Sequence, residues 1–295
     1  MDFLIPEEDR ARLPIHPKGM AFDLDGTLLD YDGRLDAAVA RSVRLMSRGG
    51  IKVFLVTGRH MSSCEHFWRE LELATPLATC NGAWVGFPGQ APLADVRLSP
   101  AALNIVRDLE ERHGLYINYY TDGGIYTLKD GPEREWYSRF YSPVELLPDK
   151  DAPILKRLPS KCLCVVRENE WGHYARLFRE ALRNAAVVTS SSGRAIEVIP
   201  ANADKATGLR SLAGWAGIPL SDFIAVGDAM NDLPMLEAAG FSITFKSGDP
   251  DLANHVDMVI PPLWEDGMDV LARCILGLSD SGRFLTPRSR RFFRK

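Results

Sequence analysis

The sequence lacks the features that define several classes of protein. No apolar run reaches the roughly 18–20 residues that a membrane-spanning helix needs. The N-terminal stretch carries charged residues from Glu7 to Arg12 and has no apolar segment of the secretory kind. With 24 glycines and 19 prolines in 295 residues, collagen-like and low-complexity chains are also excluded. We therefore expect a globular cytoplasmic protein without a membrane partner, and its length predicts two domains of about 150 residues each.

Cysteine is scarce as well. The chain has five cysteines and no Cys-x-x-Cys pair. Cys162 and Cys164 alternate with Leu163 in an apolar run, so on a strand they would share one face and would not easily bridge each other. This usage predicts buried, reduced thiols rather than a disulfide framework.

Positive charge is concentrated in one place. Residues 281–295 carry six basic side chains and no acidic one. Because the whole chain has a net charge of −4, the other 280 residues carry −10. Such an acidic body binds nucleic acid poorly, since phosphate affinity is mostly electrostatic, and we expect no nucleic-acid partner. The tail is expected to be a disordered, accessory end.

Alternating apolar runs and helical patterns organise the chain. Short buried strands are expected within 19–25 and at 51–56 and 223–226, with helices between them, which favours a parallel α/β sheet. From residue 84 to residue 199 the pattern changes to strands joined by short turns with two helical stretches, which favours an antiparallel α+β insert. The Pro-rich segment 142–159 is expected to be an irregular loop.

The predicted division is therefore a discontinuous one. One α/β domain is assembled from residues 16–83 and 200–280, and residues 84–199 form a second domain inserted into it. Residues 1–15 and 281–295 are terminal extensions.

Three of the expected strands end in polar residues. Asp23 and Asp25 follow the first, Thr57 follows the second, and Asp228 follows a later one. Ligands of open α/β sheets bind beyond the carboxyl ends of the strands, so these residues are candidates for one site. In an extended segment Asp23 and Asp25 face the same way. The alternative is a simple acidic turn, since Asp and Gly favour turns.

The neighbouring residues have two interpretations each. Gly58 after Thr57 either turns amides toward an anion or makes an ordinary turn. Lys205 is expected at a helix start, where the dipole does not favour a cation. Asp228 and Asp232 are either a metal ligand and its support or acids that stabilise a helix N-terminus.

Together and in this order, the residues resemble the four motifs of the haloacid dehalogenase superfamily, whose members are mostly phosphatases. The resemblance covers roughly residues 18–277. The insert and Asn81-Gly82-Ala83 resemble the Cof-type branch, class IIB, which carries a large α/β cap. Two departures stand out: Lys205-Ala206 replaces Lys-Gly, and Phe245-Lys246-Ser247-Gly248 replaces Met-Gly-Asn-Ala. The matching motifs are Asp23-Leu24-Asp25-Gly26-Thr27-Leu28, Thr57-Gly58-Arg59, Lys205 and Gly227-Asp228-x-x-Asn231-Asp232.

The resemblance implies a Rossmann-like, parallel three-layer core with an α+β cap, and a Mg²⁺-dependent phosphatase of small phosphorylated metabolites, above all sugar phosphates. It implies an aspartyl-phosphate route, with Asp23 as the nucleophile and Asp25 as the general acid and base. Asp23, the backbone carbonyl of Asp25, and Asp228 would hold Mg²⁺, with Asp232 in support. The phosphoryl group would be bound by Thr57, Gly58, Lys205 and Asn231.

By the same resemblance the insert covers the site and grips the leaving group. Two other functions stay open: a phosphomannomutase-like phosphotransferase, and a non-catalytic regulator that binds RNA or membrane through its tail. Trp136 and Tyr137 belong either to the core of the insert or to a face that stacks on sugar. Candidate grips, each more often a surface residue, are Tyr126, Arg134, Arg139, Lys161 and Arg194.

Overall fold

The computed structural model describes residues 11–14, 16–190 and 193–278. The basic tail 281–295 and most of the expected N-terminal extension lie outside these residues. Leu13, within that extension, packs into the hydrophobic core. Among the described residues, no helix is both long and apolar enough to cross a membrane.

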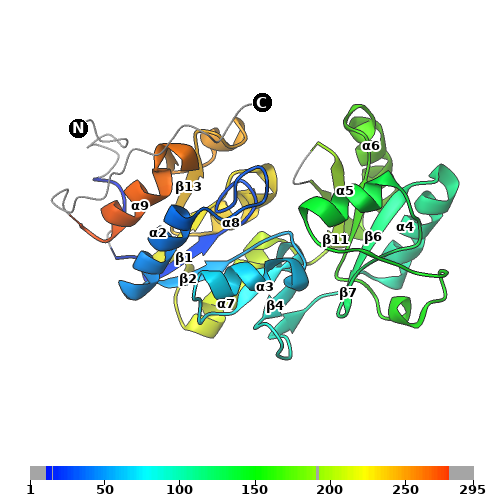
Figure 1. Ribbon diagram of the computed structural model, residues 1–295, viewed down its shortest axis with the longest axis horizontal. Coiled ribbons are helices and arrows are strands. Elements are labelled where there is room, and N and C mark those ends of the chain that lie inside the picture. The colour runs from blue at the N-terminus through cyan, green and yellow to red at the C-terminus, as the bar shows by residue number, and fades with distance from the viewer. Residues whose placement is uncertain (1–10, 15, 191–192, 279–295) are drawn as a thin grey trace.

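A five-stranded parallel sheet lies at the centre of one lobe (Figure 1), in the order β14-β13-β12-β1-β2. β1 lies between β12 and β2, and its last residue, Phe22, pairs with Val226 on one side and Leu55 on the other. The carboxyl ends of these three strands are therefore adjacent. The strands are β1 (Gly19–Phe22), β2 (Lys52–Leu55), β12 (Phe223–Val226), β13 (Phe241–Phe245) and β14 (Met258–Ile260).

Helices cover both faces of this sheet because successive strand residues point to opposite sides. Met20 and Phe22 of β1 pack in one hydrophobic cluster with α2, α3 and α9, whereas Ala21 packs in another with α7 and α8. This helix–sheet–helix layering confirms the predicted α/β class. The helices are α2 (Ala37–Arg48), α3 (Met61–Glu70), α7 (Lys205–Ala216), α8 (Leu233–Ala238) and α9 (Gly267–Ile275).

A second lobe, on the right in Figure 1, contains a six-stranded sheet in the order β10-β11-β9-β6-β7-β8. Its neighbouring strands are antiparallel except for β7 and β8. Its strands are β6 (Tyr116–Thr121), β7 (Gly124–Thr127), β8 (Glu145–Leu146), β9 (Lys161–Val165), β10 (Ala186–Thr189) and β11 (Ala195–Pro200).

Three helices flank the second sheet. α4 (Pro100–His113) and α6 (Trp171–Leu182) pack on one face in a cluster that includes both Cys162 and Cys164, which confirms that these thiols share a side. α5 (Pro132–Phe140) packs on the other face through Tyr137. This arrangement is the α+β architecture expected of the inserted segment.

A small sheet continues the first lobe. β3 (Leu77–Thr79) pairs with β4 (Trp84–Gly86), which pairs with β5 (Ala94–Asp95). A bridge between Val56 and Ala78 connects it to the strand-end loop after β2. β4 and β5 thus pair with β3 and not with the six-stranded sheet.

Several elements were not expected from the sequence. β4, β5 and α5 are additional, and the segment 142–159 contains β8 and a short 3₁₀ turn at Pro153–Lys156. Tyr137 is the one buried residue of α5.

Candidate active site

The strand-end residues meet at the carboxyl edge of the parallel sheet. Asp23 follows β1, Thr57 follows β2, and Asp228 follows β12 one residue after the strand. Asp23, Asp25, Gly58, Asp228 and Asn231 line one cleft between the lobes. Thr57 is fully buried beside it.

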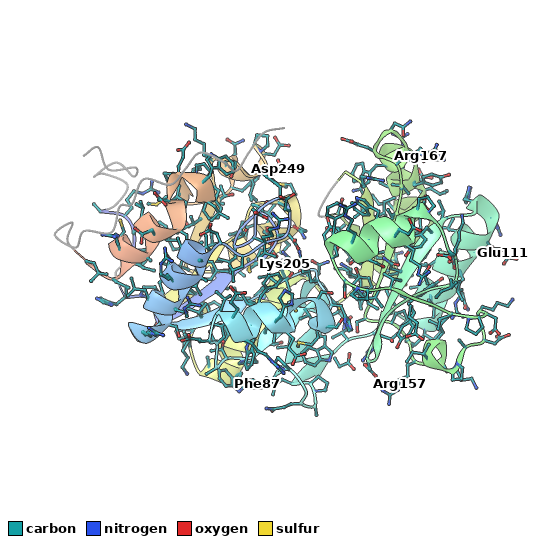
Figure 2. All side chains as sticks on the ribbon, viewed as in Figure 1. Phe87, Glu111, Arg157, Arg167, Lys205 and Asp249 are labelled. Carbon is teal, nitrogen blue, oxygen red and sulfur yellow. The ribbon has the colours of Figure 1, made fainter. Side chains whose placement is uncertain are left out.

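Lys205 forms the centre of the buried charge network. It is the first residue of α7, its side chain is 1% exposed, and its Nζ lies 2.7 Å from Asp23 Oδ1 and 2.5 Å from Asp232 Oδ1. Asp204 caps the helix, accepting a hydrogen bond from the Thr207 N–H. Figure 2 labels Lys205 in the lobe of the parallel sheet, on its side toward the second lobe. The helix dipole disfavours a positive charge at the start of α7, and the carboxylates of Asp23 and Asp232 compensate for it.

Asp232 uses both of its carboxylate oxygens within the protein. Oδ1 accepts from Lys205, and Oδ2 accepts from the backbone N–H groups of Asp228 and Ala229, each at 3.0 Å. Its side chain therefore fixes the loop that carries Asp228.

Burial and neighbouring acids disturb the ionisation of this cluster. Burial raises the pKa of Asp23 well above its usual value; Lys205 opposes the shift, and Asp232, Asp228 and Asp25 add to it. The pKa of Asp228 is raised to about 7, first by burial and then by Asp232. Burial alone would lower the pKa of Lys205, but its two carboxylates outweigh it, so the pKa is raised and the lysine stays charged.

The donor set fits a divalent metal ion. Carboxylate oxygens of Asp23, Asp228 and Asp232 lie within 4.8 Å of one another. When all three carboxylates are ionised, they and the one ammonium of Lys205 carry a net charge of −2 in a buried space, which a divalent cation would neutralise. Hard oxygen donors in a site with room for water suit Mg²⁺. Because Asp232 is committed to Lys205 and the loop, Asp23 and Asp228 are the better ligands.

Gly26 and Thr27 fit closely against Asp228. Gly26 has a φ of +75°, and a Cβ there would lie 2.1 Å from Asp228 Oδ2, so only glycine is accommodated. The Thr27 hydroxyl donates to Asp228 Oδ1 at 3.1 Å. Gly248, in the segment that departs from the family pattern, lies against the backbone of Asp228: a Cβ there would be 2.8 Å from its carbonyl oxygen.

Asp25 is gripped by Arg59. The guanidinium donates through Nε at 2.9 Å and through its terminal nitrogen at 2.6 Å, a two-armed ion pair. Arg59 is 5% exposed and lies 5.5 Å from the ring centres of both Phe67 and Tyr141. Arg59 was expected from the sequence to turn away and brace its loop, and its pairing with Asp25 was not predicted.

The second lobe supplies the other wall of the cleft. Tyr137 and Tyr141 stack on each other, with ring centres 4.9 Å apart, and Trp136 lies beside them. Lys161 and Glu197 are buried charges at the same wall. Glu197 was missed, although one acid inside the apolar strand segment 195–200 is a detectable signal.

The other candidate grips lie in different places. Tyr126 packs with the cluster around α4 and α6, Arg134 pairs with Asp130, and Arg139 lies beside the ring of Phe140. Arg194 stacks on Trp136 at 4.6 Å. Of the five basic or phenolic candidates, Lys161 alone is among the residues that line the cleft.

The chain is similar to known proteins in sequence and in fold. The model of the haloacid dehalogenase-like hydrolase family matches residues 20–269. An HMP-PP phosphatase from Escherichia coli is 30% identical over 237 residues, which cover 79% of this chain and 85% of that protein. One from Cronobacter sakazakii is 28% identical over 245 residues, covering 79% and 85% respectively.

Solved structures share the fold. A haloacid dehalogenase-like hydrolase from Bacteroides thetaiotaomicron has a TM-score of 0.75 at 21% identity, covering 87% of this chain and 98% of that one. A HAD subclass IIB sugar phosphatase has a TM-score of 0.78 at 18% identity, covering 89% and 100%. At these identities the likeness concerns the fold alone.

Proposed function

The chain belongs to the haloacid dehalogenase-like hydrolases, and from this premise we propose that it is a Mg²⁺-dependent phosphatase that hydrolyses small phosphorylated metabolites through an aspartyl-phosphate. One observation carries the proposal: Asp23, Asp228 and the Lys205–Asp232 pair meet at the carboxyl edge of the parallel sheet, beside a cleft. Phosphate esters hydrolyse extremely slowly unaided. Charged groups clustered at one site can stabilise the transition state of phosphoryl transfer.

Asp23 is the proposed nucleophile. Its carboxylate oxygen forms a bond to phosphorus while the bond to the leaving-group oxygen breaks, and Asp25 gives that oxygen a proton. Asp25 then takes a proton from water, the water oxygen attacks phosphorus, and the bond to Asp23 breaks to release inorganic phosphate. Lys205, 2.7 Å from Asp23 Oδ1, orients the attacking carboxylate.

Asp23 and Asp228 would hold Mg²⁺ together with the backbone carbonyl of Asp25. When bound, the ion supplies positive charge that masks the phosphoryl oxygens and offsets repulsion between the carboxylates. On the other side, Thr57, Gly58, Lys205 and Asn231 would bind the phosphoryl group. The side-chain oxygen of Asn231 is buried and has no hydrogen-bond partner among the described residues. That oxygen is an acceptor, so it is the amide Nδ2 that would donate to a phosphoryl oxygen.

Arg59 adds a requirement to this route. Asp25 can donate a proton only if its carboxyl group carries one, and the two-armed ion pair with Arg59 occupies both oxygens. One arm must therefore be released when substrate enters. We assign Arg59 the role of holding Asp25 aligned between turnovers.

The second lobe is the proposed cap. It belongs to the segment 84–199 inserted between core segments 16–83 and 200–280, although β4 and β5 at the start of that segment pair with β3 of the first lobe. It brings aromatic rings and the Lys161–Glu197 pair to the cleft, so it would exclude water and select the leaving group. Relatives named HMP-PP phosphatase and the sugar phosphatase of similar fold make phosphorylated small alcohols and sugar phosphates the first substrates to examine. The cytoplasm is the proposed location, in keeping with four buried cysteines that form no disulfide: Cys64, Cys80, Cys162 and Cys164.

A phosphate-release screen tests the proposal. The panel would hold sugar phosphates, nucleotides, phosphoglycolate, cofactor phosphates and HMP-PP, assayed with Mg²⁺ and with EDTA. We expect release from some of these, loss with EDTA and recovery with Mg²⁺. Undiminished activity in EDTA would contradict the metal site, and isomerisation of mannose phosphates without phosphate release would favour the phosphotransferase alternative. Asp23→Asn should remove turnover, with Asp108→Asn, an exposed acid on α4, as the matched control.

A further inference from the structure

Two buried charges of the second lobe meet at the cleft. Lys161 begins β9 and Glu197 lies in the neighbouring strand β11; each side chain is 2% exposed, and Nζ lies 3.0 Å from Oε2. Removing both charges from water is costly, and the attraction between them repays that cost only when further hydrogen bonds satisfy the pair. The location of those further bonds is therefore informative.

The further bonds go to the other lobe. Lys161 Nζ donates to the backbone carbonyl of Gly58 at 2.7 Å, and Asn81 Nδ2 donates to Glu197 Oε2 at 2.5 Å. Gly58 fits tightly here, since a Cβ would lie 3.1 Å from Asn81 Oδ1. Two residues of each lobe thus form one buried network around the turn that follows β2.

The Gly58 carbonyl is connected to Thr57 through one peptide group. The N–H of that peptide belongs to Arg59 and donates to Thr57 Oγ1 at 3.1 Å. Because a peptide group is planar, fixing its carbonyl also fixes its N–H. Since the Thr57 oxygen accepts this bond, its own proton is available to another acceptor, such as a phosphoryl oxygen.

Lys161 directs most of its donors into the protein. An ammonium has three protons. Two are directed to Gly58 and Glu197, and the Tyr120 ring centre lies 4.7 Å from Nζ. Its contacts therefore point to the phosphoryl-binding turn.

We propose that Lys161, held by Glu197, is a positioning residue supplied by the second lobe, which fixes the Gly58–Arg59 peptide and thereby orients Thr57 toward the phosphoryl group. The inference rests on the proposed phosphatase function. It differs from the earlier expectation, in which Lys161 grips the leaving group, and the two make different predictions.

The test compares the wild type with Lys161→Met on two substrates that have different leaving groups, a sugar phosphate and p-nitrophenyl phosphate. Inhibition by vanadate, which carries no leaving group, is measured alongside. We expect kcat/KM to fall by about 10- to 100-fold on both substrates, since a small misplacement of binding groups costs about that much. The inhibition constant of vanadate should rise by a similar factor, and Lys161→Arg should recover part of the loss.

Lys161→Met leaves the buried charge of Glu197 without an opposite charge. A second variant keeps the test valid if Lys161→Met unfolds for that reason. Lys161→Met/Glu197→Gln removes both buried charges, and it should fold yet show the same loss. Lys129→Met is the matched control, because Lys129 also donates to a backbone carbonyl, that of Gly114, but on the exposed side of the lobe. It should leave all three constants unchanged.

Three results would overturn the inference: unchanged kcat/KM in both variants, a loss confined to the sugar phosphate, or a loss without any change in vanadate inhibition. Failure of the proposed function looks different, because the wild type itself would then release no phosphate from any ester. Vanadate binding, followed by thermal shift, would still compare the wild type with Lys161→Met in that case.

Discussion

Lys205 sets the charge balance at the residue scale. One ammonium is surrounded by the carboxylates of Asp23 and Asp232, and Asp228 adds a third acid close by. Breaking such a buried pair by removing one partner typically costs about 3–5 kcal/mol, because a charge is left uncompensated. The three carboxylates also repel one another, and a bound cation would reduce that repulsion.

A pH dependence follows from Asp228. Its pKa is raised to about 7 by burial and by Asp232, so its protonated form stabilises the metal-free fold. This stabilisation is complete below the ordinary carboxyl pKa and is lost as pH rises through about 7. Protons and Mg²⁺ compete for the same oxygens. We therefore expect Mg²⁺ to raise the melting temperature by several degrees at about pH 8 and by much less at about pH 5.

Differential scanning fluorimetry at both pH values measures this effect. Asp228→Asn, which removes the titrating group, should abolish most of the gain at the higher pH. An equal Mg²⁺ effect at the two pH values would contradict the assignment of Asp228 as a ligand.

The candidate site residues that could be predicted from the sequence are those next to the ends of predicted strands and helices. Asp23, Asp25, Asp228 and Lys205 stand at the ends or beginnings of elements with clear hydrophobic patterns. Partners such as Arg59 for Asp25 could not be predicted, because a pairing across 34 residues depends on how neighbouring strands and their loops are placed. The same holds for Asn81 and Glu197, which are 116 residues apart, and for Lys161 and Gly58.

At the element scale, the turn after β3 is packed directly against α7. Gly82 has a φ of +84°, and a Cβ there would lie 2.1 Å from the carbonyl oxygen of Asp204 and 2.9 Å from the nitrogen of Gly208. Both atoms are backbone and cannot rotate away. This contact fixes the start of α7, where Lys205 begins.

Gly82→Ala should therefore destabilise the protein by at least about 3 kcal/mol, through left-handed strain and overpacking together. The matched control is Gly89→Ala, since Gly89 has a similar φ of +71° but nothing within 4 Å of its Cβ position. It should cost only about 1 kcal/mol. Urea unfolding measures both, and equal losses for the two variants would contradict the close packing of turn and helix.

Elements with strong periodicity were predictable, and those built by tertiary contacts were not. The central strands and α2, α4 and α6 follow their hydrophobic patterns. α5 was not predicted. It packs on the second sheet mainly through Tyr137, and its aromatic neighbours lie near the cleft. β5 and β8 are two residues long, too short for any pattern to mark.

At the scale of the whole molecule, both lobes line the cleft. The acids and Lys205 come from the lobe of the parallel sheet, and the aromatic wall with Lys161 and Glu197 comes from the other. All of these site residues lie between residues 23 and 232. The acidic body does not attract phosphate esters at long range, so their binding depends on local positive charge.

Deletion of residues 281–295 tests whether the basic tail contributes. We expect kcat/KM on small substrates to stay within about twofold of the full chain, because truncation of terminal segments is commonly tolerated. A loss of activity that added salt reproduces in the full chain would assign the tail an electrostatic role in substrate capture.

The aspartyl-phosphate on Asp23 is the central claim of this account. Acid quenching during turnover, followed by protease digestion and mass spectrometry, detects it directly. The account predicts one added phosphoryl group on the peptide that contains Asp23, present with Mg²⁺, absent in EDTA and absent in Asp23→Asn. Turnover with no phosphorylated peptide at any quench time, or with the phosphoryl group on another residue, would contradict it.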